Sequence, residues 1–146
     1  MFDTFEGFCL EDIVHDSDTY RAFEKGQFAN NPFKVYKPEL QIEIVKNRMI
    51  YPENLKICKG YFPKSAIGIE DRFCFVNLDM DLYKPQLEGL RFFYNKMTKG
   101  GVILLHDYFH SELPGVQDVV TKFENELNYS LTKVPIGDFC SLAIIC

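Results

Sequence analysis

The fold is decided by residues 73–107, which read FCFVNLDMDLYKPQLEGLRFFYNKMTKGGVILLHD. The first part, Phe73 to Leu78, has the composition of a strand, and it should stop at Asp79-Met80-Asp81. A helix should follow, beginning near Pro85 and ending at Lys99-Gly100-Gly101. The apolar residues that recur there at helical spacing are Leu87, Leu90, Tyr94 and Met97.

The same stretch closes with a second strand, Val102 to Leu105, which ends at His106-Asp107. Four apolar residues in a row are expected of a parallel strand that is covered on both faces. Downstream, apolar spacing predicts a helix from Val116 to Leu127. Two closing strands, Leu131 to Val134 and Phe139 to Cys146, should form a hairpin. This order of elements is typical of a three-layer α/β domain.

The segment before residue 73 is less regular. Residues 1–38 predict an irregular loop region, in which Asp18 to Lys25 could form a short helix and His15 could sit on a loop over a substrate. A helix should follow Pro38, and Leu55 to Tyr61 should form a strand. No repeat or linker divides the chain, so we treat residues 1–146 as a single domain with its α/β portion at 39–146.

Composition excludes several classes of protein. The chain has 146 residues, of which 47% are hydrophobic and 25% charged, and its net charge is −5. An acidic chain without a basic stripe is not expected to bind nucleic acid. The apolar runs are too short for a membrane span, and no export signal is present, which favours a cytoplasmic protein. The five cysteines lack a CxxC pair and mostly lie in apolar runs, so we expect reduced core residues.

Acidic residues follow both strands predicted within residues 73–107. In open α/β sheets, ligands bind beyond the carboxyl ends of the strands. Asp79, Asp107 and perhaps His106 could therefore supply part of the coordination shell of a hard divalent cation, with substrate oxygens filling the rest. Such a cation would lower the pKa of a bound hydroxyl. The alternative is that Asp79 and Asp107 cap the helices that follow them.

Six motifs together resemble the macrocin O-methyltransferase family over nearly the whole chain. They are Asp3-Thr4-Phe5-Glu6-Gly7-Phe8, Lys59-Gly60-Tyr61-Phe62-Pro63, Asn77-Leu78-Asp79-Met80-Asp81-Leu82-Tyr83, Phe92-Phe93-Tyr94, Gly100-Gly101-Val102-Ile103 and His106-Asp107-Tyr108. The resemblance implies a Rossmann-like class I methyltransferase fold. It also implies S-adenosylmethionine as methyl donor, Mg²⁺ as metal, and a sugar hydroxyl of a glycoside or polysaccharide as acceptor.

The resemblance also implies roles for single residues. Asp79 would be a metal ligand and general base, and Asp107 a second metal ligand. Asp3 would hydrogen-bond the ribose of the cofactor, with Thr4 and Phe5 beside it.

The sequence departs from the family pattern in two places. The family has Asp-Asp-Tyr where this chain has His106-Asp107-Tyr108. An imidazole thus replaces one carboxylate ligand, which makes Mn²⁺ more plausible than Mg²⁺ as the metal. Alternatively, His106 does not bind the metal and acts as the general base. The Asp-Thr-Phe-Glu-Gly motif closes the family's second strand, yet here it begins at Asp3. We therefore expect a partial three-layer sheet that lacks its first strand and most of the second. We expect no cofactor binding by the isolated chain that calorimetry could measure. The chain could pair with a missing N-terminal half or with itself.

Three other functions remain open at this point. Asp79 and Asp81 could serve a haloacid-dehalogenase-like phosphohydrolase, or they could bind the metal of a glycosyltransferase. The chain could also be a non-catalytic methyltransferase remnant that only pairs with another subunit. Exposed apolar surface where the missing strands belonged would be the mark of such a remnant.

Overall fold

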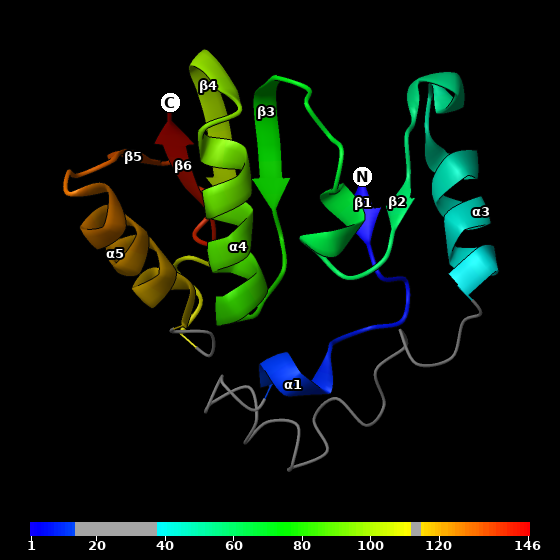
Figure 1. Cartoon of the computed structure of the whole chain (residues 1–146), viewed down its shortest axis with the longest axis horizontal. Coiled ribbons are helices and arrows are strands. Elements are labelled where there is room, and N and C mark those ends of the chain that lie inside the picture. The colour runs from blue at the N-terminus through cyan, green and yellow to red at the C-terminus, as the bar shows by residue number, and fades with distance from the viewer. Residues whose placement is uncertain (14–37, 112–114) are drawn as a thin grey trace.

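The computed structural model describes residues 1–13, 38–111 and 115–146. They form a four-stranded sheet with the strand order β3-β4-β6-β5 and a two-stranded sheet of β1 and β2 (Figure 1). The strands are β1 (Phe2–Asp3), β2 (Cys58–Lys59), β3 (Phe73–Leu78), β4 (Met97–Leu105), β5 (Thr132–Pro135) and β6 (Leu142–Ile145). The α-helices are α1 (Leu10–Ile13), α3 (Pro38–Arg48), α4 (Tyr83–Tyr94) and α5 (Gly115–Leu127).

The larger sheet has mixed strand directions. Strand β3 runs parallel to β4, and β6 runs antiparallel to both β4 and β5. The strand predicted at 73–78 is confirmed at its stated bounds, and the closing hairpin is confirmed as the β5–β6 pair. The parallel pairing of β3 with β4 brings their carboxyl ends to one edge of the sheet.

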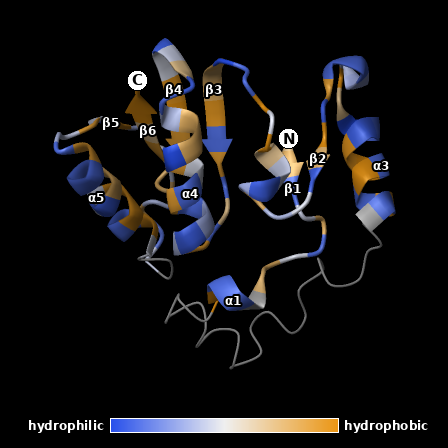
Figure 2. Cartoon of the chain, viewed as in Figure 1, coloured by the Kyte–Doolittle hydropathy of each residue, from blue (hydrophilic) through white to orange (hydrophobic). Residues whose placement is uncertain are grey.

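Helices α4 and α5 pack on each other and cover one face of the larger sheet (Figure 1). The strands beneath them are mainly hydrophobic, whereas both helices carry hydrophilic residues (Figure 2). The fully buried core residues include Leu78, Leu90, Ile103, Leu105 and Ile144. Burying each such side chain contributes roughly 1.5–3 kcal/mol. The predicted helices after Pro38 and over 116–127 are confirmed as α3 and α5.

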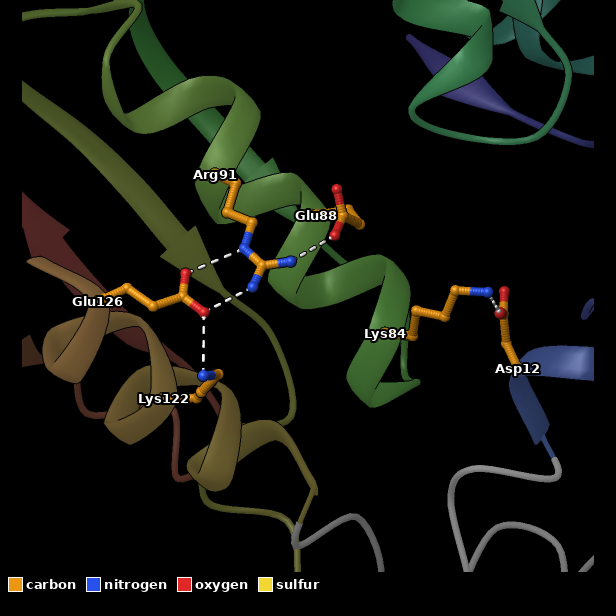
Figure 3. A network of polar contacts seen from close by, with 6 residues as sticks. All are labelled: Asp12, Lys84, Glu88, Arg91, Lys122 and Glu126. Atoms are coloured by element: carbon orange, nitrogen blue, oxygen red, sulfur yellow. Dashed lines mark hydrogen bonds and ion pairs between the residues drawn. The ribbon is translucent and has the colours of Figure 1, made fainter.

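Charged side chains join the two covering helices on the outside. Arg91 of α4 forms an ion pair with Glu126 of α5 at 2.5 Å and with Glu88 at 2.6 Å (Figure 3). Lys122 contacts the same Glu126 carboxylate at 3.3 Å. These groups are partly exposed, so we expect them to fix the helix pairing more than to add stability.

The opposite face of the larger sheet is only partly covered. Phe75 is 57% exposed and Val134 is 45% exposed, although both are apolar. Cys74 is exposed as well, so the expectation that the cysteines of apolar runs lie in the core is wrong for this residue. Its strand, β3, lies at an edge of the sheet. These exposed residues lie on a face of the sheet and do not decide between a catalytic protein and a non-catalytic remnant.

An aromatic cluster joins the small sheet to α4. The Phe93 ring stacks on Phe62 at 5.7 Å and meets Phe2 edge-on at 5.8 Å. Phe73 and Phe92 complete the cluster. Because Phe2 belongs to β1 and Phe62 follows β2, the cluster holds both short strands against the larger sheet.

The helix predicted from Pro85 to Lys99-Gly100-Gly101 ends earlier than expected. Helix α4 stops at Tyr94, and Met97 begins β4 instead of continuing the helical face. Gly100 and Gly101 are inside the strand, so they do not terminate the helix. A Cβ on Gly101 would lie 2.9 Å from the Thr98 carbonyl oxygen, and Gly100 has a φ of +77°. The glycines thus allow an irregular strand start, which the periodicity of apolar residues could not reveal.

Two strand predictions were too long. Asp138 accepts hydrogen bonds from the backbone N–H groups of Cys140 and Ser141, at 3.0 and 2.7 Å. This turn keeps residues 139–141 out of β6. The strand predicted at 55–61 pairs only at Cys58–Lys59, because its partner β1 has two residues. It belongs to the two-stranded sheet and does not pair with β3.

Some predictions concern residues 14–37, which lie outside the described residues. They include the short helix at 18–25 and the loop containing His15. No helix in the described part of the chain combines the length and apolarity that crossing a membrane requires.

Glu124 makes a pH-sensitive connection between α5 and β5. Its carboxylate accepts hydrogen bonds from Leu131 N at 2.7 Å and Lys133 Nζ at 2.6 Å. Burial alone would raise the pKa of Glu124, but these bonds lower it. An acid with a lowered pKa stabilises the fold above its unfolded pKa of about 4.3, and this stabilisation disappears as the pH falls through the folded pKa.

We therefore expect Glu124→Gln to reduce the free energy of unfolding by about 1 kcal/mol at pH 7. The difference from wild type should shrink to nothing at acid pH. Urea unfolding at several pH values measures it, and Glu53→Gln, at an exposed position, serves as the control. A difference that is the same at pH 7 and pH 3 would contradict this role.

Candidate functional site

The acidic residues that follow β3 and β4 come together at one edge of the sheet. Carboxylate oxygens of Asp79, Asp81 and Asp107 all lie within 4.8 Å of one another. The backbone N–H of His106 donates to the Leu78 carbonyl at 3.0 Å, so the pairing of the two strands continues to the site. The predicted meeting of residues 79 and 107 is thus what the structure shows.

These residues do not cap the helices that follow. Leu82 is the N-cap of α4 and makes no side-chain cap hydrogen bond, and α5 begins only at Gly115. Asp81 and Asp107 instead have left-handed φ angles of 58° and 59°. Aspartate tolerates this conformation better than most residues. The backbone therefore reverses sharply after each strand and leaves both carboxylates at the sheet edge.

Burial and the crowding of carboxylates together set the protonation of this site. Burial and the neighbouring Asp107 carboxylate raise the pKa of Asp81 to about 7. Burial alone would also raise the pKa of Asp107, but hydrogen bonds with His106, Cys140 and Asp81 lower it. A divalent cation would relieve the repulsion between these carboxylates, which the protein otherwise relieves by holding a proton.

His106 lies beside the three acids. Its Nδ1 is 2.9 Å from Asp107 Oδ2 and 3.2 Å from Asp79 Oδ1. Burial alone would lower the pKa of His106, but the hydrogen bond with Asp107 and the charge of Asp79 raise it. The other ring nitrogen, Nε2, is 3.7 Å from the Cys140 sulfur. The predicted metal residues Asp79, His106 and Asp107 therefore form one connected group.

A cavity of about 510 Å³ opens next to this group. Its lining includes Asp3, Thr4 and Phe5 together with Asp79 and Asp81. Asp3 Oδ1 accepts a hydrogen bond from Phe5 N at 2.7 Å, which fixes the carboxylate at the end of β1. The cavity is thus lined by the predicted cofactor residues and by Asp79, whereas the other two predicted metal residues, His106 and Asp107, do not line it. Its volume is typical of small-molecule sites.

A buried carboxylate that the sequence analysis did not single out helps to form this cavity. Asp12 is 2% exposed, accepts a hydrogen bond from the Tyr61 hydroxyl at 2.8 Å, and pairs with Lys84 Nζ at 2.8 Å (Figure 3). This contact connects α1 to α4. Asp12 lies within the predicted irregular region 1–38, and nothing local in the sequence indicates that its partners are 49 and 72 residues away.

Cys140 is the second residue that the sequence analysis missed. Its thiol donates to Asp107 Oδ1 at 3.3 Å, and Cys140, His106 and Asp107 form a second group of possible metal ligands. No motif indicates it, because the turn at Asp138 brings the cysteine to the site from the far end of the chain.

Comparison with known proteins gives one family and several solved structures. Residues 1–139 match the family described as Macrocin-O-methyltransferase (TylF). The O-methyltransferase NovP is similar in structure, with a TM-score of 0.74 and 20% identity over 99% of this chain and 57% of NovP. The calicheamicin methyltransferase CalS11 has a TM-score of 0.66 and 19% identity over 99% of this chain and 58% of CalS11. No curated protein matches the chain significantly.

A further structure of CalS11, described as apo TDP-rhamnose 3'-O-methyltransferase, has a TM-score of 0.57 and 17% identity. It matches over 99% of this chain and 56% of its own length. At these identities the likenesses establish the fold, a mixed α/β methyltransferase fold. The chain spans less than three fifths of each of these structures, in agreement with the predicted partial fold.

Proposed function

Because this chain belongs to the macrocin O-methyltransferase family, we propose that it transfers a methyl group from S-adenosylmethionine to a sugar hydroxyl with the help of a divalent cation. The single observation that supports this proposal is the shared cavity. Its lining includes both Asp3 and the acids Asp79 and Asp81. A methyl donor and an acceptor alcohol must meet in one enclosed space for direct transfer.

The donor set at the sheet edge fits a hard divalent cation. Asp79, Asp81 and Asp107 offer oxygen atoms within 4.8 Å of one another, and Mg²⁺ and Mn²⁺ prefer carboxylate oxygens. These residues would hold the ion, and His106 would orient two of them through Nδ1. When bound, the ion would lower the pKa of the acceptor hydroxyl.

Asp79 is the residue best placed to accept the proton of that hydroxyl. It lines the cavity, whereas His106 contacts Asp79 from outside the cavity lining. The hydroxyl oxygen would attack the methyl carbon, the carbon–sulfur bond of the donor would break, and the proton would pass to Asp79. His106, whose Nδ1 is 3.2 Å from Asp79 Oδ1, would stabilise Asp79 in the orientation that receives it.

The cofactor would lie over the end of β1. Asp3 would accept hydrogen bonds from its ribose hydroxyls, with Thr4 and Phe5 forming the adjoining wall. A turn supports this wall, since Thr4 Oγ1 donates to the Gly7 carbonyl at 3.0 Å and accepts from Glu6 N at 3.1 Å. For the methionine end of the cofactor, the sequence offers no glycine-rich turn after a strand.

The alternatives are less well supported. A phosphohydrolase or glycosyltransferase would use Asp79 and Asp81, but neither function accounts for a methyltransferase family match that extends over residues 1–139.

A methyl-transfer assay tests the proposed function. The chain, and in parallel any longer product of the same gene, is incubated with methyl-labelled S-adenosylmethionine and TDP-rhamnose, which the name of one structural neighbour suggests as acceptor. Other nucleotide sugars and glycosides are included. We expect label in a sugar when Mg²⁺ or Mn²⁺ is present, and at least a tenfold loss after chelation. Absence of transfer to every acceptor by both proteins would contradict the proposal.

A further inference from the structure

The geometry points to a second metal site at the same sheet edge, for a thiophilic cation of the Zn²⁺ class. We propose that His106 Nε2, Cys140 Sγ and Asp107 Oδ1 are its three protein ligands. They belong to two loops far apart in the sequence, the end of β4 and the turn before β6. This site needs no methyl transfer, and it uses a nitrogen and a sulfur that the oxygen-only set of Asp79, Asp81 and Asp107 does not use.

The spacing of the three ligand atoms suits a tetrahedral ion. Zinc bonds of about 2.3 Å to sulfur and about 2.0–2.1 Å to nitrogen or oxygen place neighbouring ligands of a tetrahedron about 3.5 Å apart. The Cys140 sulfur is 3.7 Å from His106 Nε2 and 3.3 Å from Asp107 Oδ1. One possible ligand atom from each of the three residues lies within 4.8 Å of the other two. Only small shifts would bring them onto a single ion, with one position left open.

The orientation of the His106 ring also suits metal binding. A histidine that binds zinc through one nitrogen usually donates its other N–H to a carboxylate or carbonyl. Here Nδ1 faces Asp79 Oδ1 at 3.2 Å and Asp107 Oδ2 at 2.9 Å, so Nε2 is the nitrogen that faces the sulfur. Asp79 would thus fix the ring from outside the zinc site.

The backbone holds Cys140 in place independently of any ion. Phe109 N donates to the Cys140 carbonyl at 2.9 Å, and Cys140 N donates to Asp138 Oδ1 at 3.0 Å. The neighbouring Ser141 is 2% exposed. The two loops are therefore fixed against each other, and the ligands do not have to be assembled from mobile segments. On binding, the thiol would release its proton to solvent and bind as thiolate.

The two metal sets share Asp107. If the oxygen-only set holds Mg²⁺, as the proposed function requires, a zinc ion would withdraw one of its three carboxylates. Zinc is then expected to compete with magnesium and to inhibit methyl transfer. This consequence rests on the proposed function, whereas the zinc site itself does not.

Cobalt(II) titration of the full chain tests the site, because a thiolate bound to cobalt gives a charge-transfer absorption in the near ultraviolet. We expect this absorption in wild type and in Cys74→Ser, a matched loss of one exposed thiol, and none in Cys140→Ser. Calorimetry with Zn²⁺ should show at least a tenfold weaker affinity for Cys140→Ser than for Cys74→Ser. Circular dichroism confirms that both variants are folded.

A third variant separates this proposal from the proposed function. Asp81→Asn should weaken Mg²⁺ binding while leaving the cobalt absorption and Zn²⁺ affinity within about threefold of wild type. A cobalt absorption or Zn²⁺ affinity unchanged in Cys140→Ser would overturn the zinc site. If no variant alters Mg²⁺ binding but Cys140→Ser still removes the cobalt absorption, the magnesium site fails and the zinc site stands.

Discussion

Asp107→Asn is expected to weaken Mg²⁺ and Mn²⁺ binding to this chain about 100-fold, or about 2.8 kcal/mol. Asp107 is 8% exposed and belongs to both groups of possible metal ligands. The substitution keeps the size of the side chain but removes the charge that a hard cation requires most. Isothermal titration calorimetry with each ion measures the effect.

Asp118→Asn provides the control for net charge, since Asp118 is an exposed acid on α5. It should leave the affinity for both ions within about twofold of wild type. Equal affinities for Asp107→Asn and Asp118→Asn would mean that Asp107 does not bind the ion. A thermal melt of each protein shows whether any loss of binding reflects unfolding instead.

Phe93→Ala is expected to have the largest effect on stability, a loss of about 3–5 kcal/mol in the free energy of unfolding. Phe93 is 4% exposed and packs its ring against Phe2, Phe62, Phe73 and Phe92. Truncation would leave a void where the small sheet meets α4. In a chain of this length, the midpoint of thermal unfolding should fall by roughly 10 °C.

Phe139→Ala is the matched control, because Phe139 is 94% exposed. Its free energy of unfolding should stay within about 0.5 kcal/mol of wild type. A similar loss in both variants would show that the aromatic cluster does not hold the molecule together. Phe2 and Phe62 also line the cavity, so a folded Phe93→Ala protein should show altered ligand binding there.

The sequence revealed those parts of the fold whose signals are local. A run of mainly apolar residues predicted β3. Helical spacing predicted α5 from Val116, one residue after its observed start at Gly115. Met97 shows where such signals fail, because one apolar residue fits both the end of a helical stripe and the start of a strand. Only the pairing of Phe73 with Met97 across the sheet decides between the two.

The candidate site, too, could be predicted only where its signals are local in the sequence. Strand ends and paired acids indicated Asp79 and Asp107, because parallel neighbours must end at the same sheet edge. Cys140 and Asp12 reach their partners only through the tertiary fold, and no spacing along the chain encodes those contacts. The position of Asp81 could be read from the sequence, but its raised pKa depends on burial and on Asp107.

A crystal of the chain soaked in Mn²⁺ tests the central claim most directly, since anomalous scattering locates the ion independently of activity. We expect one strong anomalous peak at the ends of β3 and β4, about 2.0–2.6 Å from carboxylate oxygens of both Asp79 and Asp107. The absence of a peak there at saturating Mn²⁺, or a peak bound by only one of the two residues, would contradict the account.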